Sequence, residues 1–97
     1  MLIRTFRDLD VFRESYAAAL DISKLTKAFP GFEQFELARQ LRRAARAIGS
    51  CDEVKLWLEM SKDEGYASKE AIKVLMDRFN RIGAMLASLW KHWRNGE

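Results

Sequence analysis

The chain has 97 residues, enough for one small domain with a real core, and we expect a single domain over residues 1–97. Hydrophobic residues make up 48% and charged residues 32% of the chain, a composition that excludes a disordered or low-complexity protein. The net charge of +3 is too small to indicate a nucleic-acid partner by itself, although only residues 49–66 are acidic and the other segments are basic.

Cysteine content and hydropathy exclude several further classes. Cys51 is the single cysteine, so there is no internal disulfide, and it has no Cys or His neighbours with metal-ligand spacing. We therefore expect no cofactor. No stretch is apolar for long enough to cross a bilayer, and the N-terminus is too short and polar for a signal peptide. These features predict a cytoplasmic protein without a membrane partner.

The first predicted helix begins at residue 7 or 8 and runs to about residue 28, because Pro30 stops it. It has two apolar arcs. One arc contains Leu9, Phe12, Tyr16, Ala19, Leu20 and Ser23, and the other contains Val11, Ala18, Ile22, Leu25 and Phe29. A helix that is apolar over so much of its circumference is buried by more than one partner, and we expect another subunit to be one of them.

The second predicted helix covers residues 32–48 and divides into two faces. Its apolar face contains Leu37, Leu41, Ala44, Ala45 and Ile48. The opposite face contains Arg39, Arg42, Arg43 and Arg46, with Phe32 and Phe35 near it. Arginine stems can cover apolar surface while their charged ends stay in water, so such a cluster is compatible with a stable helix.

Two more helices are predicted, over residues 50–64 and 68–94. Ser50 and Glu53 form a capping-box pattern, Gly65 is suited to end the third helix, and Ser68 is suited to cap the fourth. The fourth helix carries a seven-residue apolar repeat, with core positions at Ile72, Leu75, Phe79, Ile82, Leu86 and Leu89. The chain is therefore predicted to be all-α, an antiparallel up-down helical bundle in which the last helix is the longest.

Five segments in chain order carry a resemblance to one family: FRDLDVF (6–12), LTKAFP (25–30), LARQLRRAA (37–45), GSCDEV (49–54) and KDEGY (62–66). They resemble the small four-helix bundle proteins named after open reading frames in intervening sequences of 23S ribosomal RNA. The resemblance implies an up-down four-helix bundle and, for some members, a homopentameric ring. A related branch is the accessory protein of diversity-generating retroelements, in which a basic ring works with nucleic acid and a reverse transcriptase. No catalytic residues can be transferred from this family.

The chain departs from the family after the second helix. The family has a Pro-x-Asn-Ile-Ala-Glu-Gly-like turn there, followed by the first half of the third helix, whereas Ile48 runs directly into Gly49-Ser50 here. The third helix is thus apparently truncated. Either the protein is a shortened member or the sequence lacks a segment at this point, and the regular flanking matches favour the second explanation. Both explanations predict a break or a sharp non-helical connection at Ile48–Gly49.

The candidate site is the arginine face of the second helix, which consists of Arg39, Arg42, Arg43 and Arg46. Guanidinium groups pair with phosphates and stack on bases, so this face could follow an RNA or DNA backbone. The competing interpretations are a solvated face, or ion pairs with the acidic third segment of a neighbouring subunit. His92 is interpreted as a cation at a helix end, and Cys51 as a small buried side chain rather than a reactive thiol.

Three functional hypotheses remain open from the sequence. The first is a non-catalytic oligomeric bundle that binds nucleic acid, with a homo-oligomer, by resemblance a pentamer, as the expected assembly. The second is an assembly or adaptor module whose basic face meets acidic protein surfaces. The third, a small enzyme, is disfavoured because no acid–base or metal-binding constellation is visible, and we expect neither catalysis nor a small-molecule substrate.

Overall fold

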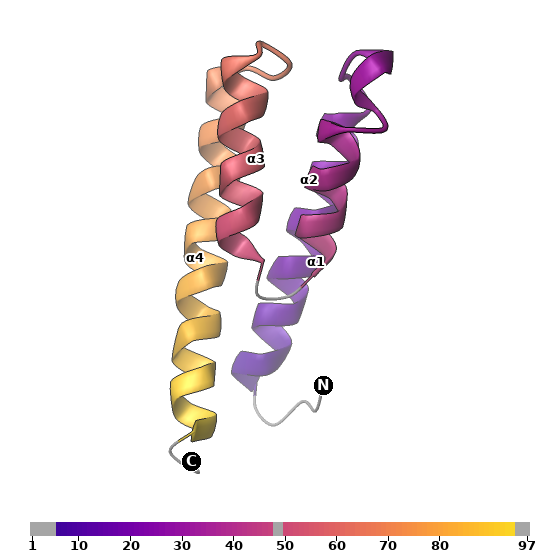
Figure 1. Ribbon diagram of the computed structural model, residues 1–97. Coiled ribbons are helices and arrows are strands. Elements are labelled where there is room, and N and C mark those ends of the chain that lie inside the picture. Colours follow the sequence, from indigo (N-terminus) through magenta and orange to yellow (C-terminus); the bar gives the residue numbers. More distant parts are fainter. Residues whose placement is uncertain (1–5, 48–49, 95–97) are drawn as a thin grey trace.

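Four helices pack side by side and alternate in direction along the chain (Figure 1). The computed structural model describes residues 6–47 and 50–94. Its elements are α1 (Phe6–Thr26), the short 3-10 helix η1 (Gly31–Glu33), α2 (Leu37–Arg46), α3 (Cys51–Asp63) and α4 (Lys69–Arg94). Helices α1 and α3 each contact α2 and α4, so the four helices stand at the corners of a square. The predicted all-α, antiparallel up-down four-helix bundle is confirmed.

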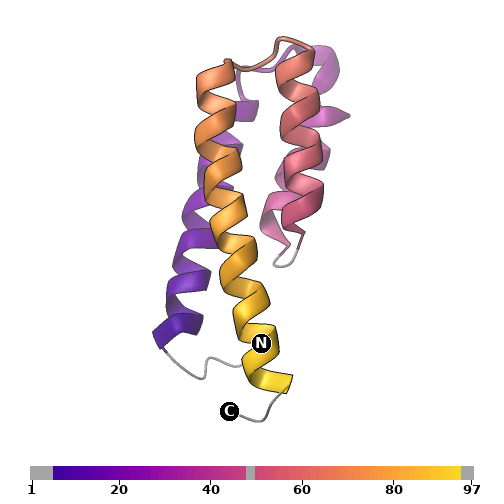
Figure 2. The same cartoon turned by 90° about the vertical axis from the view of Figure 1, so that its left-hand side faces the viewer.

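The four helices form a long pair and a short pair. Helices α1 and α4 have 21 and 26 residues, whereas α2 and α3 have 10 and 13. At about 1.5 Å per residue, α4 is about 39 Å long and α2 only about 15 Å. Figures 1 and 2 show that α2 and α3 lie beside one end of the long pair, and that the start of α1 and the end of α4 extend past them. The third helix is therefore short, half the length of the fourth.

The core contains the apolar repeat of α4. All six predicted core positions of this helix are at most 6% exposed: Ile72, Leu75, Phe79, Ile82, Leu86 and Leu89. They pack with buried residues from the other three helices, among them Ile22, Leu41 and Leu58. The seven-residue spacing keeps one stripe of α4 facing its neighbours along the helix, which is why the prediction for this helix is confirmed in full.

Only one of the two apolar arcs of α1 is covered within the chain. Val11, Ala18 and Ile22 are buried, as the second arc requires. On the other arc Tyr16 is 70% exposed and Leu20 is 48% exposed. Helix α1 thus presents an apolar strip that no described part of the same chain covers.

The second helix starts later than predicted, at Leu37 instead of residue 32. The backbone before it turns through η1 and a bend at Glu36, where φ is −109° and ψ is −94°. The cause is a polar contact that periodicity does not reveal. The side-chain amide of Gln34 donates to the carbonyl oxygens of Thr26 at 2.8 Å and of Phe29 at 3.1 Å, which ties this turn to the end of α1.

Only the C-terminal end of α3 follows the sequence pattern. The predicted capping box is wrong: Ser50 makes no side-chain capping bond, and the carboxylate of Glu53 accepts a hydrogen bond from the indole N–H of Trp57 at 3.3 Å instead. At the other end Gly65 adopts a φ of 78°, the left-handed conformation that favours glycine.

Backbone bonds complete this helix end. The N–H of Gly65 donates to the carbonyl of Lys62 at 3.0 Å, and the N–H of Tyr66 donates to that of Ser61 at 2.9 Å. This pair of bonds is the Schellman arrangement that closes many helices. Ser68 then begins α4 as predicted, because its hydroxyl oxygen accepts a hydrogen bond from the N–H of Ala71 at 3.1 Å.

The predicted break at Ile48–Gly49 lies outside the described residues. On its two sides, Ala47 has extended backbone angles and the N–H of Ser50 donates to the carbonyl of Ala47 at 3.1 Å. Helix α2 ends before these positions, and α3 begins after them in the opposite direction.

We predict that Leu86→Ala lowers the free energy of unfolding by about 2–5 kcal/mol, because the substitution removes buried methyl groups from the core. Val74→Ala is the matched control, since Val74 lies on the same helix and is 59% exposed. Its effect should stay within about 0.5 kcal/mol. Urea unfolding of the three proteins measures both values, and equal effects of the two substitutions would contradict the assignment of the core.

Candidate nucleic-acid interface

The outer face of α2 is basic because of the spacing of its arginines. Arg39, Arg43 and Arg46 are separated by four and three residues, so their side chains leave the helix on one side. All three are exposed, and none of them forms an ion pair with a carboxylate among the described residues. Together with Arg42 and Ala47 they line an open depression of about 490 Å³. The structure thus brings all four predicted arginines together.

Arg42 differs from the other three arginines. It is half-buried, and its guanidinium donates to the hydroxyl oxygen of Thr26, to the side-chain oxygen of Gln34 and to the backbone carbonyl of Gln34, each at 3.2 Å. These bonds join α2 to the end of α1 and to the turn before α2. Of the four predicted arginines, Arg42 therefore has hydrogen-bond partners within the chain, whereas Arg39, Arg43 and Arg46 are exposed.

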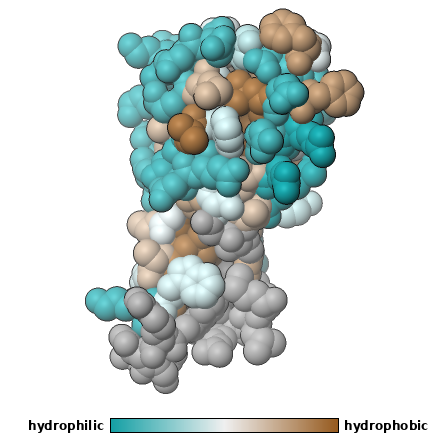
Figure 3. Space-filling model, in the orientation of Figure 1, coloured by the Kyte–Doolittle hydropathy of each residue, from teal (hydrophilic) through white to brown (hydrophobic). Residues whose placement is uncertain are grey.

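An exposed aromatic pair stands beside this basic face. Phe32 on η1 is 73% exposed and Phe35, in the turn between η1 and α2, is 79% exposed. The surface view shows hydrophobic side chains that stand out from the molecule at the end where Figure 1 places this turn, next to strongly hydrophilic ones (Figure 3). The sequence placed both rings near the arginines, and their neighbour Phe29 is buried.

Tyr66 supplies a second contact that fixes η1. The hydroxyl of Tyr66, just after α3, donates a hydrogen bond of 2.8 Å to the carboxylate of Glu33. The ring of Tyr66 also packs against Phe29 and Phe32, with centroid distances of 5.5 and 6.3 Å. The hydrogen bond to Glu33, partial burial and the adjacent negative charge raise the pKa of Tyr66 to about 12. Sequence reasoning missed this contact because its two residues are 33 positions apart.

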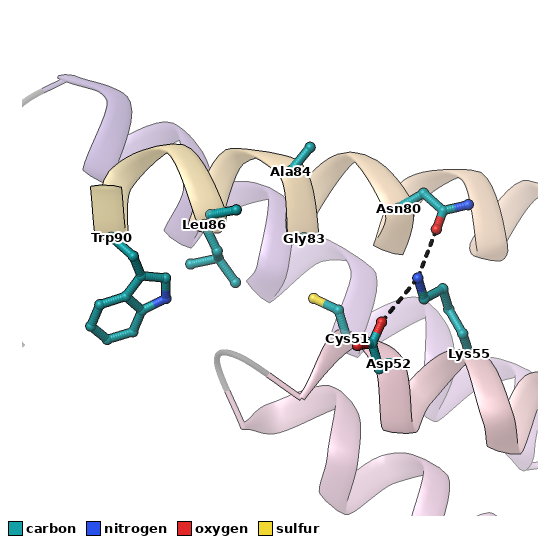
Figure 4. Close-up of a pocket in the computed structure, with 9 residues that line it drawn as sticks. Cys51, Asp52, Lys55, Asn80, Gly83, Ala84, Leu86 and Trp90 are labelled. Atoms are coloured by element: carbon teal, nitrogen blue, oxygen red, sulfur yellow. Dashed lines mark hydrogen bonds and ion pairs between the residues drawn. The ribbon is translucent and has the colours of Figure 1, made fainter. Parts of the chain in front are cut away.

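A second depression, of about 330 Å³, lies where the start of α3 meets α4 (Figure 4). Its polar groups satisfy one another: the ammonium of Lys55 lies 2.9 Å from the side-chain oxygen of Asn80 and 3.1 Å from the carboxylate of Asp52. Cys51 packs beside Gly83, and burial raises the pKa of its thiol above the ordinary value. The thiol is thus half-buried, where a small buried side chain was predicted, and its raised pKa lowers the share of reactive thiolate at neutral pH.

In the part of the chain that the structure describes, no three His, Cys, Asp or Glu side chains are grouped so that they could hold a metal ion. None of the helices described is both long and apolar enough to cross a membrane. His92 lies in the last turn of α4, far along the chain from the arginine face on α2.

The protein is a small antiparallel four-helix bundle with a basic outer face on its second helix. Residues 7–50 match the family model of the 23S rRNA-intervening sequence protein. The predicted resemblance to this family is thereby confirmed over α1, η1 and α2, which include all four arginines. The match ends at Ser50, next to the junction where the sequence departs from the family pattern, and residues 51–97 lie outside it. No curated protein matches the chain.

We predict that Arg42→Ala costs about 1–3 kcal/mol of stability, because it leaves the oxygens of Thr26 and Gln34 without their charged donor. Arg43→Ala is the matched control on the next residue, which is exposed, and should cost less than about 0.5 kcal/mol. Chemical unfolding of both variants provides the comparison. Equal and small losses would show that the bonds of Arg42 do not hold the turn.

We also predict a pH dependence from Tyr66. Since its folded pKa of about 12 lies above the ordinary value of about 10, its bond to Glu33 stabilises the fold fully below pH ~10. That contribution is lost as the pH rises through about 12. The stability difference between the wild type and Tyr66→Phe should therefore shrink as the pH rises from about 10 to about 12.

Ultraviolet absorbance of phenolate measures the same ionisation directly. The native protein should show one tyrosine that titrates near pH 12, and this step should be absent from Tyr66→Phe and shifted to lower pH in Glu33→Gln. An unchanged titration in Glu33→Gln would show that the carboxylate is not the cause.

Proposed function

We propose that this protein is a non-catalytic oligomeric helical bundle that binds RNA or DNA without sequence preference through Arg39, Arg43 and Arg46. The observation that carries the proposal is the set of three exposed guanidinium groups on one side of a rigid helix, which no carboxylate of the described chain neutralises. If these charges were neutralised within the chain, the three arginines would have carboxylate partners, as Arg78 and Arg81 do.

The geometry of α2 suits a phosphate backbone. Arg39 and Arg46 are seven residues apart, which corresponds to about 10 Å along a helix axis. In double-stranded DNA each strand carries one phosphate per about 3.4 Å of helix axis, so the face spans roughly three phosphates of such a strand. Contacts of this kind fix position and affinity but carry no sequence information, which is why we propose binding without sequence preference.

Self-association is the second element of the proposal, and the uncovered strip of α1 supports it. Phe12, Tyr16, Ala19 and Leu20 line an apolar groove of about 460 Å³, together with Ala45 and Arg46 from α2. Exposed apolar strips of this kind commonly mark contacts with other molecules. Because Arg46 lies at both the groove and the basic face, joined subunits would bring several basic faces close together and strengthen binding by multivalency. The resemblance implies a ring of five.

The same strip favours a second candidate function, an assembly or adaptor module that contacts other proteins and no nucleic acid. The two functions differ in their response to salt. Binding through phosphates weakens steeply as salt rises, because each neutralised phosphate releases counterions. Contacts through the apolar strip of α1 depend much less on salt.

We predict that the protein binds fluorescent RNA and DNA at low salt, and that Arg39→Gln/Arg43→Gln/Arg46→Gln reduces the affinity at least tenfold for every sequence tested, as expected for about three lost phosphate contacts. The matched control is Lys69→Gln/Lys73→Gln/Lys91→Gln, which removes the same charge from exposed positions of α4, a helix that does not contact α2. Fluorescence anisotropy at two salt concentrations measures both effects. Absence of binding at low salt, or equal losses in the two triple variants, would contradict the proposal.

We predict that light scattering at micromolar concentration gives a mass above that of the 11.3 kDa chain. Leu20→Glu should reduce the mass to that of a monomer, because it places a charge on the apolar strip of α1. Val74→Glu changes a similarly exposed apolar residue on α4 and should leave the assembly intact. A monomer mass for the wild type would rule out self-association in this range.

A further inference from the structure

The turn between α1 and α2 carries two aromatic rings that are largely exposed to solvent. Among the large hydrophobic side chains described, Phe32 and Phe35 have the highest exposed fractions. The residues that join this turn to the core are different ones: Phe29 before it and Leu37 after it are both buried. Transfer of two phenyl rings to water is unfavourable, so their position calls for a partner that covers them.

The turn that carries these rings is held in place at three points. Gln34 binds the end of α1, Arg42 binds Gln34, and Glu33 accepts the hydrogen bond from Tyr66. Phe32 also contacts the ring of Tyr66 edge-on. A ligand that meets these rings therefore meets a surface that is already ordered and loses little affinity to the ordering of a loop.

The same bonds connect the rings to the basic face. Arg42 lies between Arg39 and Arg43 on α2 and binds both oxygens of Gln34, the residue next to Phe35. Arg39 follows Phe35 by only four residues, so their Cα atoms are at most about 15 Å apart. The exposed rings and the arginines that form no ion pair among the described residues are thus linked through Gln34 and Arg42 and lie close along the chain.

We propose that the ligand of this surface is single-stranded nucleic acid, in which unpaired bases stack on Phe32 and Phe35 while Arg39, Arg43 and Arg46 take the phosphates. This inference rests on the proposed function and adds the class of strand to it. Bases of a duplex are stacked inside the helix and cannot reach the rings, whereas an unpaired base presents its face to any aromatic side chain. The positive charge beside the rings favours a polyanion over an apolar protein segment as the molecule that covers them.

The test uses anisotropy with three probes of equal length: a mixed-sequence single strand, the same sequence as a duplex, and a single strand with abasic sites, which keeps the phosphates and lacks the bases. We expect the wild type to bind the single strand most tightly. Phe32→Ala/Phe35→Ala should weaken binding of that probe about tenfold or more and leave the duplex and abasic affinities unchanged. The slope of affinity against salt should also stay unchanged, since no phosphate contact is lost.

Two controls separate this effect from misfolding. Phe35→Ala alone removes a ring that makes no aromatic contact within residues 6–47 and 50–94, and should give part of the loss with an unchanged melting temperature. Leu56→Ala/Val74→Ala removes two comparably exposed apolar side chains from α3 and α4, and should change no affinity.

Any of the following results would overturn the inference. Equal affinity of the wild type for single strand and duplex, or unchanged single-strand binding by the phenylalanine variant, would remove it while leaving the proposed function in place. A fall in oligomer mass in that variant, with unchanged single-strand affinity, would assign the rings to a protein contact. Failure of all three probes to bind at low salt would remove the inference and the proposed function together.

Discussion

The hydrogen bonds of Arg42 are the contact on which the candidate surface depends. One guanidinium reaches the hydroxyl of Thr26 at the end of α1 and both oxygens of Gln34 in the following turn. Gln34 in turn binds backbone carbonyls at the end of α1. These bonds connect the end of α1, the turn that carries Phe32 and Phe35, and helix α2. Arg39, Arg43 and Arg46 lie on the same helix and form no ion pair with a carboxylate among the described residues.

Unequal helix lengths are the second constraint. Helices α2 and α3 cover only one end of α1 and α4 (Figures 1 and 2). The apolar strip with Tyr16 and Leu20 remains on the outside of α1, beside the end of α2, where Arg46 borders the same groove. The chain thus combines a charged surface and an apolar surface on adjacent helices, and the proposals of polyanion binding and self-association rest on these two surfaces.

Much of the fold could be predicted because its determinants are local. The seven-residue repeat from Ile72 to Leu89, the left-handed Gly65 and the cap at Ser68 each depend on residues within one or two turns. The capping box at Ser50 failed although it is equally local, because Ser50, with φ −94° and ψ 27°, lacks the extended backbone of a capping residue. A pattern states which bonds are possible, and the backbone conformation decides which of them form.

For the candidate site, the sequence predicted which arginines gather on one face but not which of them are available. The difference between Arg42 and Arg43 depends on acceptors 8 and 16 residues earlier in the chain, which no helical wheel contains. The hydrogen bond from Tyr66 to Glu33 joins residues that are even further apart in the chain. Such contacts become visible only when the turn between α1 and α2 is built in three dimensions.

The most direct test of this division of roles compares Arg42→Gln with Arg43→Gln, each measured for stability and for the salt dependence of nucleic-acid binding. Arg43→Gln should keep the wild-type stability and reduce the slope of log affinity against log salt by about 0.7 to 0.9, the value for one phosphate contact. Arg42→Gln should lower the stability and leave that slope unchanged at temperatures where the variant stays folded. Two variants that behave alike in both measurements would contradict the account.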